Sequence, residues 1–113
     1  MAFRASGRMS MMPFSRVHPL LREPNRLALL GAIISAKSTP TFNELLEKLG
    51  LSKGNLSAHT KKMEEAGLIT VEKHFVDRKP QTTCVATPAG REAINTYLDE
   101  METFIASNRG GRE

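Results

Sequence analysis

Apolar residues recur at helical spacing in two short neighbouring segments near the middle of the chain. In the first segment, four of them share one helical face: Phe42, Leu45, Leu46 and Leu49. Thr41 precedes this segment and Glu44 follows three residues later, which is the spacing of a reciprocal capping box. Gly50 comes next, and glycine readily adopts the left-handed conformation that ends a helix. The pattern predicts a helix that begins at Thr41 and stops at Gly50.

A second short helix is predicted only a few residues later. Ser52 offers an N-cap side chain, and Gly67 marks the far end of the segment. One face carries the inward residues Leu56, Thr60 and Met63. Two helices joined so tightly must cross at a steep angle, as they do in a helix-turn-helix.

The hydrophobic period changes from helical to two after the second helix. Residues 68–76 and 81–86 alternate between apolar and polar positions and are rich in residues that favour strands. Asp77, Arg78, Lys79 and Pro80 lie between them and are predicted to form the link. The pattern therefore predicts a β-hairpin with a basic tip.

A helix is expected on each side of this unit. Pro24 suits the first turn of the earlier helix, whose predicted buried stripe is Leu27, Leu30, Ile33 and Ile34. Thr87 and Pro88 open the last helix, which we expect to run to about Ser107. The predicted fold is α+β: a winged helix-turn-helix with a three-helix core, a two-stranded β-hairpin wing and a long C-terminal helix.

The outward face of the second helix is small, polar and cationic. Its residues are Gly54, Ala58 and Lys61, flanked by Asn55, Ser57 and Lys62. A helix in the major groove of DNA needs small residues where its backbone approaches, amide or cationic side chains for base edges, and hydroxyls or cations for phosphates. An ordinary solvated face is the alternative for this helix, and a soluble charged turn is the alternative for the hairpin tip. The occurrence of this helix face beside a hairpin with a basic tip favours DNA binding over both alternatives.

These segments together resemble the winged-helix transcriptional regulators of bacteria and archaea, of the MarR and ArsR type. Four stretches carry the resemblance: Gly50 to His59, Glu64 to Ile69, Asp77 to Pro80, and Thr87 to Gly90. The segment from His18 to Leu27 is similar to the start of a small single-domain subfamily. Members of the family usually have leucine where this chain has Thr60, which makes the core softer unless the hydroxyl bonds to a carbonyl one turn back.

The resemblance implies a homodimer that binds double-stranded DNA at a palindromic operator. Residues 52–66 would be the recognition helix in the major groove, and residues 77–81 the wing on the minor groove or the backbone. The candidate DNA-binding residues are Ser52, Lys53, Gly54, Asn55, Ser57, Ala58, Lys61, Lys62, Arg78 and Lys79. No feature of the sequence specifies a small-molecule effector.

The last helix carries an apolar stripe that is too long for one small wing to cover. We expect a two-fold dimer through this helix and the N-terminal region, with the interface residues Leu20, Leu21, Ile94, Tyr97, Leu98, Met101, Phe104 and Ile105. The alternative is that the stripe packs back on Leu20, Leu21 and Leu27 of the same chain.

The net charge of the chain is +4, and the excess lies at the N-terminus, where four arginines precede the first acidic residue, Glu23. We expect the chain to have three parts: a basic arm or leader at 1–16, the winged-helix domain at 17–107 with its dimerisation helix at 88–107, and a flexible tail at 108–113.

The expected location of the protein is the cytoplasm, because no stretch approaches the ~20 apolar residues of a membrane span. An acid-free, Arg- and Ser-rich leader also fits a transit peptide.

The sequence does not predict an enzyme. Cys84 has no second cysteine to pair with, which favours a packing role over a redox sensor. His18, His59 and His74 lie in separate elements without the spacing of a zinc site, so we expect no metal and no cofactor.

Two function classes are alternatives to a DNA-binding regulator. A winged-helix protein-interaction module would lack cations on the outward face of the second helix. An RNA-binding domain would expose aromatic side chains for stacking on bases.

Overall fold

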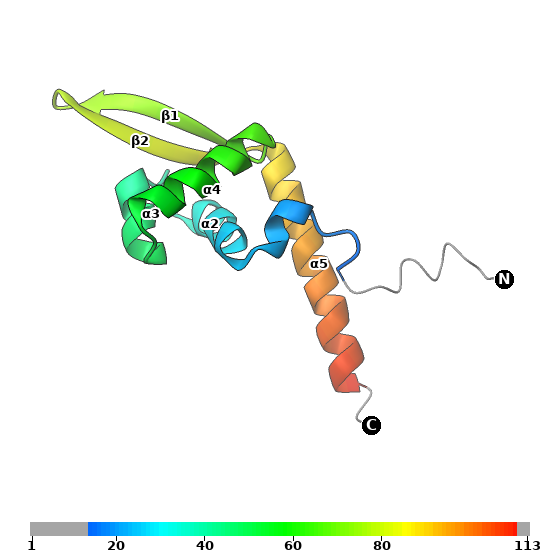
Figure 1. Cartoon of the computed structure of the whole chain (residues 1–113). Coiled ribbons are helices and arrows are strands. Elements are labelled where there is room, and N and C mark those ends of the chain that lie inside the picture. The colour runs from blue at the N-terminus through cyan, green and yellow to red at the C-terminus, as the bar shows by residue number, and fades with distance from the viewer. Residues whose placement is uncertain (1–13, 111–113) are drawn as a thin grey trace.

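Three short helices pack under one end of a long β-hairpin, and a longer helix leaves this body at the base of the hairpin (Figure 1). The computed structural model describes residues 14–110. Its elements, in order, are η1 (Pro19–Arg22), α2 (Pro24–Ser35), α3 (Phe42–Leu49), α4 (Lys53–Glu65), β1 (Ile69–Val76), β2 (Lys79–Ala86) and α5 (Pro88–Gly110). The order confirms the winged helix-turn-helix that the sequence predicts.

The predicted helix caps of the helix-turn-helix are present. The Thr41 side chain accepts from the Glu44 backbone N–H at 3.0 Å, and the Glu44 carboxylate accepts from the Thr41 N–H at 2.9 Å. Gly50 has a φ angle of 67° and donates to the Leu46 carbonyl. The Ser52 side chain accepts from the Asn55 N–H at 3.1 Å and so begins α4. These local bonds hold the turn between α3 and α4 to three residues, Gly50, Leu51 and Ser52.

The tip of the hairpin differs from the prediction. Strands β1 and β2 pair from Ile69 opposite Ala86 to Val76 opposite Lys79, so the turn contains only Asp77 and Arg78. Both have positive φ angles, 53° and 69°, as a type I′ turn requires. The predicted four-residue link was therefore wrong, because Lys79 and Pro80 belong to β2.

Pro80 fits within β2 because the ladder does not use its nitrogen. The Cys84 N–H donates to the Pro40 carbonyl at 3.1 Å, on the side of β2 away from β1. Backbone N–H groups alternate in direction along a strand, so the nitrogen of Pro80, four residues earlier, also faces away from β1. Proline is tolerated at such an edge position.

The core lies between α2, α3, α4 and the inner half of the hairpin. Its most deeply buried large side chains are Leu21, Leu29, Leu30, Leu45, Leu56, Met63, Ile69 and Cys84. The buried stripe of α2 is shifted from the prediction, because Leu29 and Ala32 are buried whereas Leu27 and Ile34 are only partly buried. Thr60 is buried, and its hydroxyl donates to the Ser57 carbonyl at 3.0 Å, so this polar group is satisfied within α4.

The start of α5 is fastened to the corner between α4 and β1. The Thr87 hydroxyl donates to the Gly67 carbonyl at 2.6 Å and accepts from the Gly90 N–H at 3.0 Å. The helix runs to Gly110, so the predicted end near Ser107 was too early and residues 108–110 are helical. Residues 111–113 of the predicted tail, and residues 1–13 of the predicted N-terminal arm, lie outside the described range.

The segment before α2 packs on the side of α5. The Phe14 ring stacks on Tyr97 with centroids 5.9 Å apart and lies 5.4 Å from the ring of Phe104. The Arg16 guanidinium donates to the Glu100 carboxylate at 2.9 Å. The short helix η1, which the sequence pattern did not predict, follows and buries Leu21.

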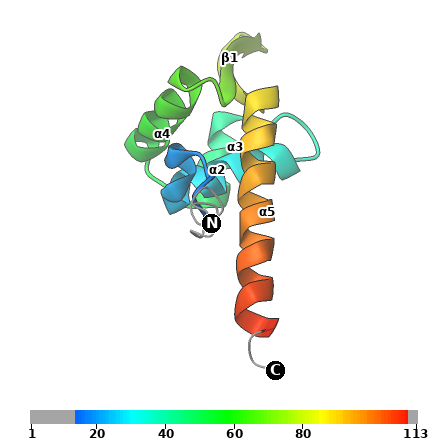
Figure 2. The ribbon, with the colours of Figure 1, turned by 90° about the vertical axis from the view of Figure 1, so that its right-hand side faces the viewer.

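The apolar stripe of α5 is only partly covered. Ile94 is buried, whereas Leu98, Phe104 and Ile105 are 50%, 39% and 39% exposed. The stripe therefore packs partly on its own chain, where Phe14 contacts Tyr97 and Phe104. Packing on Leu20, Leu21 and Leu27 stays a prediction. The later turns of α5 project from the body (Figure 2).

Candidate nucleic-acid interface

Helix α4 presents two different faces. Leu56 and Met63 are fully buried against the core, and Thr60 lies between them. The ten residues that the sequence assigns to DNA binding are all exposed: Ser52, Lys53, Gly54, Asn55, Ser57, Ala58, Lys61 and Lys62 on or just before α4, and Arg78 and Lys79 at the wing. The fold thus keeps the small, polar and cationic face of α4 free of packing.

Gly54 leaves open space on this face. A Cβ atom built at Gly54 would have no neighbour within 4 Å, so no close packing within the chain requires glycine there. Together with Ala58, one turn later, it leaves the backbone of α4 uncovered over its first two turns. A ligand surface can therefore approach the helix closely at these positions.

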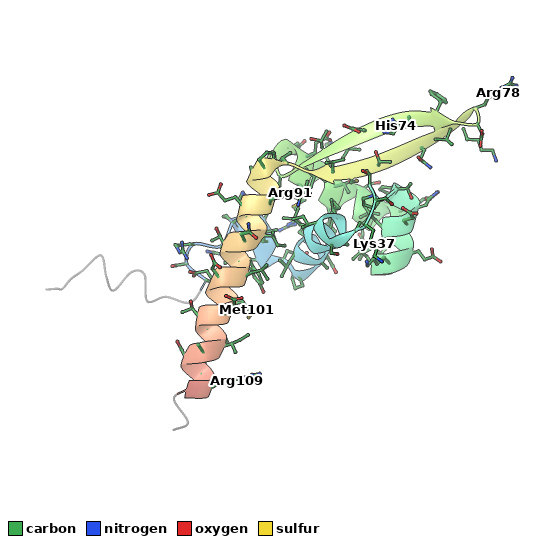
Figure 3. The ribbon with its side chains drawn as sticks, turned by 180° about the vertical axis from the view of Figure 1, so that it is seen from behind. Lys37, His74, Arg78, Arg91, Met101 and Arg109 are labelled. Atoms are coloured by element: carbon green, nitrogen blue, oxygen red, sulfur yellow. The ribbon has the colours of Figure 1, made fainter. Side chains whose placement is uncertain are left out.

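The wing carries its cations at its far end. Arg78 lies at the apex of the hairpin, and its side chain points away from the body (Figure 3). Lys79 follows as the first residue of β2, and Lys73 lies on the exposed outer part of β1. Within residues 14–110, Arg16 pairs with Glu100, and the His74 ring lies 3.6 Å from the Glu72 carboxylate. None of the lysines or arginines of α4 and the wing has an acidic partner there.

A cleft lies between the wing and the helix-turn-helix. Its volume is about 530 Å³, and its lining is Thr41, Phe42, Asn43, Lys53, Val76, Lys79, Pro80, Gln81 and Thr82. The lining contains two lysines, two hydroxyls and two amides, and no acidic side chain. Such a surface suits a polyanion.

Three polar residues of this cleft, Thr41, Asn43 and Thr82, are not among the residues that the sequence predicts for DNA binding. Gln81 is included there only as the last residue of the predicted wing, 77–81. Their shared location depends on the bridge between Thr41 and Thr83, which joins the start of α3 to β2. A contact over forty residues of chain has no signature in local periodicity.

The cysteine and histidine residues do not form a reactive site. Burial raises the pKa of the Cys84 thiol to about 11, with a smaller contribution from the Glu64 carboxylate, so the thiol stays protonated at neutral pH. The Nε2 atom of His74 lies 3.1 Å from the Thr83 hydroxyl. In the part of the chain that the structure describes, no group of three or more His, Cys, Asp or Glu residues is placed to hold a metal ion.

Comparison of the sequence with protein families gives the same fold as the structure does. The family described as the winged helix DNA-binding domain matches residues 25–105 of this chain. The chain belongs to this family. The match includes the helix-turn-helix, the wing and most of α5, so every element of the candidate interface lies within the winged-helix region.

Individual relatives of this winged-helix protein agree with the family match. An uncharacterized protein of Methanocaldococcus jannaschii is 40% identical over 60 residues, which are 53% of this chain and 65% of the relative, slightly less than two thirds of its length. The structure is similar to that of a transcriptional regulator homologue from Pyrococcus horikoshii, with a TM-score of 0.71 and 27% identity over 78% of this chain and 86% of that one.

The structure of MarR from Staphylococcus aureus is also similar to this winged-helix protein. Its TM-score is 0.67 at 20% identity, over 87% of this chain and 67% of that chain. The family match shows a winged-helix DNA-binding domain, and the likeness to MarR shows the same fold. In residues 14–110, no helix of this winged-helix protein has the length and apolar character needed to cross a membrane.

Proposed function

We propose that this protein is a sequence-specific transcriptional regulator that binds palindromic operator DNA as a homodimer. The observation that carries the proposal is the exposed surface formed by the outward face of α4 and the tip of the wing, whose lysines and arginine have no acidic partner within residues 14–110. In this proposal α4 enters the major groove, where Asn55 and Lys61 reach base edges. Arg78 at the wing tip lies on the minor groove or the adjoining phosphates.

The cleft between α4 and the wing supports this placement. A major groove and the adjoining minor groove are separated by one sugar–phosphate strand, so a protein that occupies both must let that strand pass between its two reading elements. The lysine-lined cleft lies in this position, between the start of α4 and the outer part of β2. Lys53 and Lys79 would flank the strand, and Asn43 and Gln81 would hydrogen-bond its phosphates.

The exposed part of α5 supports a dimer. Leu98, Phe104 and Ile105 are apolar and exposed in the single chain, and Met101 lies among them. Leu21 and Ile94 are already buried in the core of their own chain, so we leave these two out of the proposed interface. A two-fold pairing of α5 would place two copies of α4 for two half-sites about one helical turn apart.

The first experiment selects bound fragments from genomic DNA and then titrates the best fragment at several salt concentrations. We expect a two-fold symmetric site that is bound well above random duplex, with affinity that falls as salt rises. Binding that is absent, or equal for every duplex, would overturn the proposal and favour a protein-interaction module.

Two variants separate base reading from backbone contact. Asn55→Ala is expected to relax preference at particular operator positions, because an asparagine amide reads base edges. Arg78→Ala is expected to weaken binding to all duplexes and to reduce the salt dependence, because its contact is mainly to phosphates or to groove width. The matched control is Lys37→Ala, which removes an exposed cation on the loop after α2, outside the proposed interface, and should change neither quantity (Figure 3). Equal losses on every sequence for Asn55→Ala and Arg78→Ala would contradict this division of roles.

A further inference from the structure

The outer part of the wing exposes a phenylalanine. Phe75 is 80% exposed, more than any other exposed large apolar side chain in residues 14–110, and Val76 beside it is 46% exposed. Phe75 lies two residues before the Asp77–Arg78 turn. A large apolar side chain so far out on a polar hairpin is unfavourable in water, since most of its surface is hydrated.

The strand register explains why Phe75 has nothing beneath it. Side chains two residues apart share a face of a strand, so Phe75 continues the row of Ile69, Val71 and Lys73. Ile69 is buried and Val71 is partly buried against the helices, but Lys73 and Phe75 are exposed. The outer part of the hairpin therefore extends past the helices (Figure 1). Phe75, the last apolar position of this row, is not packed against the core.

Folding does not account for this phenylalanine. The turn is set by the positive φ angles of Asp77 and Arg78, and the cross-strand neighbour of Phe75 is Pro80, which stays exposed as well. The core already ends at Val71 and Cys84, which pair with each other four residues nearer the body than Phe75 and Pro80 do. The exposed ring therefore contributes little to the stability of the single chain.

The surroundings of Phe75 fit DNA. Three cations, Lys73, Arg78 and Lys79, lie within four residues of it, against two acids, Glu72 and Asp77, and none of the three cations has an acidic partner within residues 14–110. The same outer segment continues into the cleft through Val76 and Pro80, so Phe75 adjoins the proposed DNA surface rather than lying on a separate one. An apolar protein partner would not require this excess of unpaired cations.

We propose that Phe75 packs against the deoxyribose walls of the minor groove while Arg78 contacts the phosphates or the groove floor. This inference rests on the proposed DNA-binding function and adds to it an apolar contact that does not depend on salt. The minor groove of B-DNA is about 6 Å wide, which admits an aromatic ring edge-on. Apolar side chains inserted in minor grooves are a known means of adding affinity there.

The test compares Phe75→Ala, Phe75→Leu and the control Thr70→Ala, an exposed position near the base of the same strand. Each full-length protein is titrated with the selected duplex at several salt concentrations. Phe75→Ala should weaken binding by about tenfold, since much of an aromatic ring loses its apolar contact. The slope of affinity against salt should stay unchanged, and Phe75→Leu should recover most of the loss. Thr70→Ala should bind as the wild type does.

Three further outcomes decide between the explanations. Wild-type binding with no loss in Phe75→Ala would overturn this inference and leave the proposed function intact. Wild-type protein that binds no duplex would overturn the proposed function itself. A change of mass in light scattering for Phe75→Ala, with unchanged affinity for DNA, would assign the ring to a contact between chains and so overturn its role on DNA. Thermal melting should be the same for all variants, because Phe75 lies outside the core.

Discussion

At the scale of single residues, Gly54 differs from the glycines that the fold requires. Gly50 and Gly67 have φ angles of 67° and 79°, so the turns that they form favour glycine. Gly54 has no positive φ angle and nothing near its missing Cβ, and it lies in the first turn of α4, where glycine is a poor helix former. The fold therefore does not require glycine here, and in the proposed complex its small size would let DNA approach α4.

We predict that Gly54→Leu weakens DNA binding and leaves the fold intact. The new side chain would fill the space through which DNA approaches the helix, so affinity for the operator should fall by about tenfold or more, which corresponds to at least ~1.4 kcal/mol. Stability should rise by about 0.5–1 kcal/mol, because leucine is a better helix former than glycine. Chemical denaturation and operator titration measure the two effects. Unchanged affinity would mean that DNA does not approach α4 at this position.

At the level of the elements, a close backbone contact at Gly90 sets the position of the start of α5. A Cβ atom on Gly90 would collide with the carbonyl oxygen of Leu68, at the corner where β1 begins. The Thr87 hydroxyl bonds to Gly67 on the same corner and caps α5 through the Gly90 N–H. The wing and the start of α5 are thus held in one fixed arrangement.

We predict that Gly90→Ala destabilises the protein by about 1–3 kcal/mol, because the backbone of α5 must move away from Leu68. The matched control is Gly31→Ala in α2, where a new Cβ would have no neighbour within 4 Å. That substitution should be neutral or stabilising by up to about 1 kcal/mol, as expected for alanine in a helix. Urea denaturation of both variants checks the difference. Equal stabilities would show that the corner adapts at no cost.

The sequence predicts the helix caps better than it predicts the hairpin tip. The bonds of Thr41, Glu44, Gly50 and Ser52 join residues three or four apart, so their spacing is visible in the sequence. The two-residue turn is not visible in this way, because Lys79 and Pro80 are typical turn residues. Their place in β2 depends on the direction of the Pro80 nitrogen, which is set only by pairing with β1 and by the contact of Cys84 with Pro40.

At the scale of the whole molecule, one part of the candidate site can be predicted from the sequence and another part cannot. The outward face of α4 and Arg78 follow from periodicity and composition alone. The cleft does not, since it forms only when the start of α3 meets the outer part of β2. The coverage of α5 also depends on a distant segment, because Phe14 packs on Tyr97 and Phe104. Long-range packing decides which parts of an apolar stripe stay free for a second chain.

The free part of α5 leads to the last prediction. The 23 residues of α5 span about 34 Å, and its later turns carry Leu98 and Ile105 exposed to water. If these residues form a two-fold interface, Ile105→Asp should convert the dimer into a chain of 12.5 kDa, because burying an unpaired carboxylate is costly. Ile105 is a cleaner position than Phe104, whose ring also contacts Phe14 in its own chain.

The control for Ile105→Asp is Thr103→Asp, which adds the same charge to an exposed polar position of α5. Light scattering should give twice 12.5 kDa for the wild type and the control, and 12.5 kDa for Ile105→Asp. The monomer should also lose affinity for the full palindrome while still binding a half-site weakly, because each chain keeps its own α4 and wing. A dimer in all three proteins would place the interface away from these turns of α5, and a monomeric wild type would rule out a stable dimer in the absence of DNA.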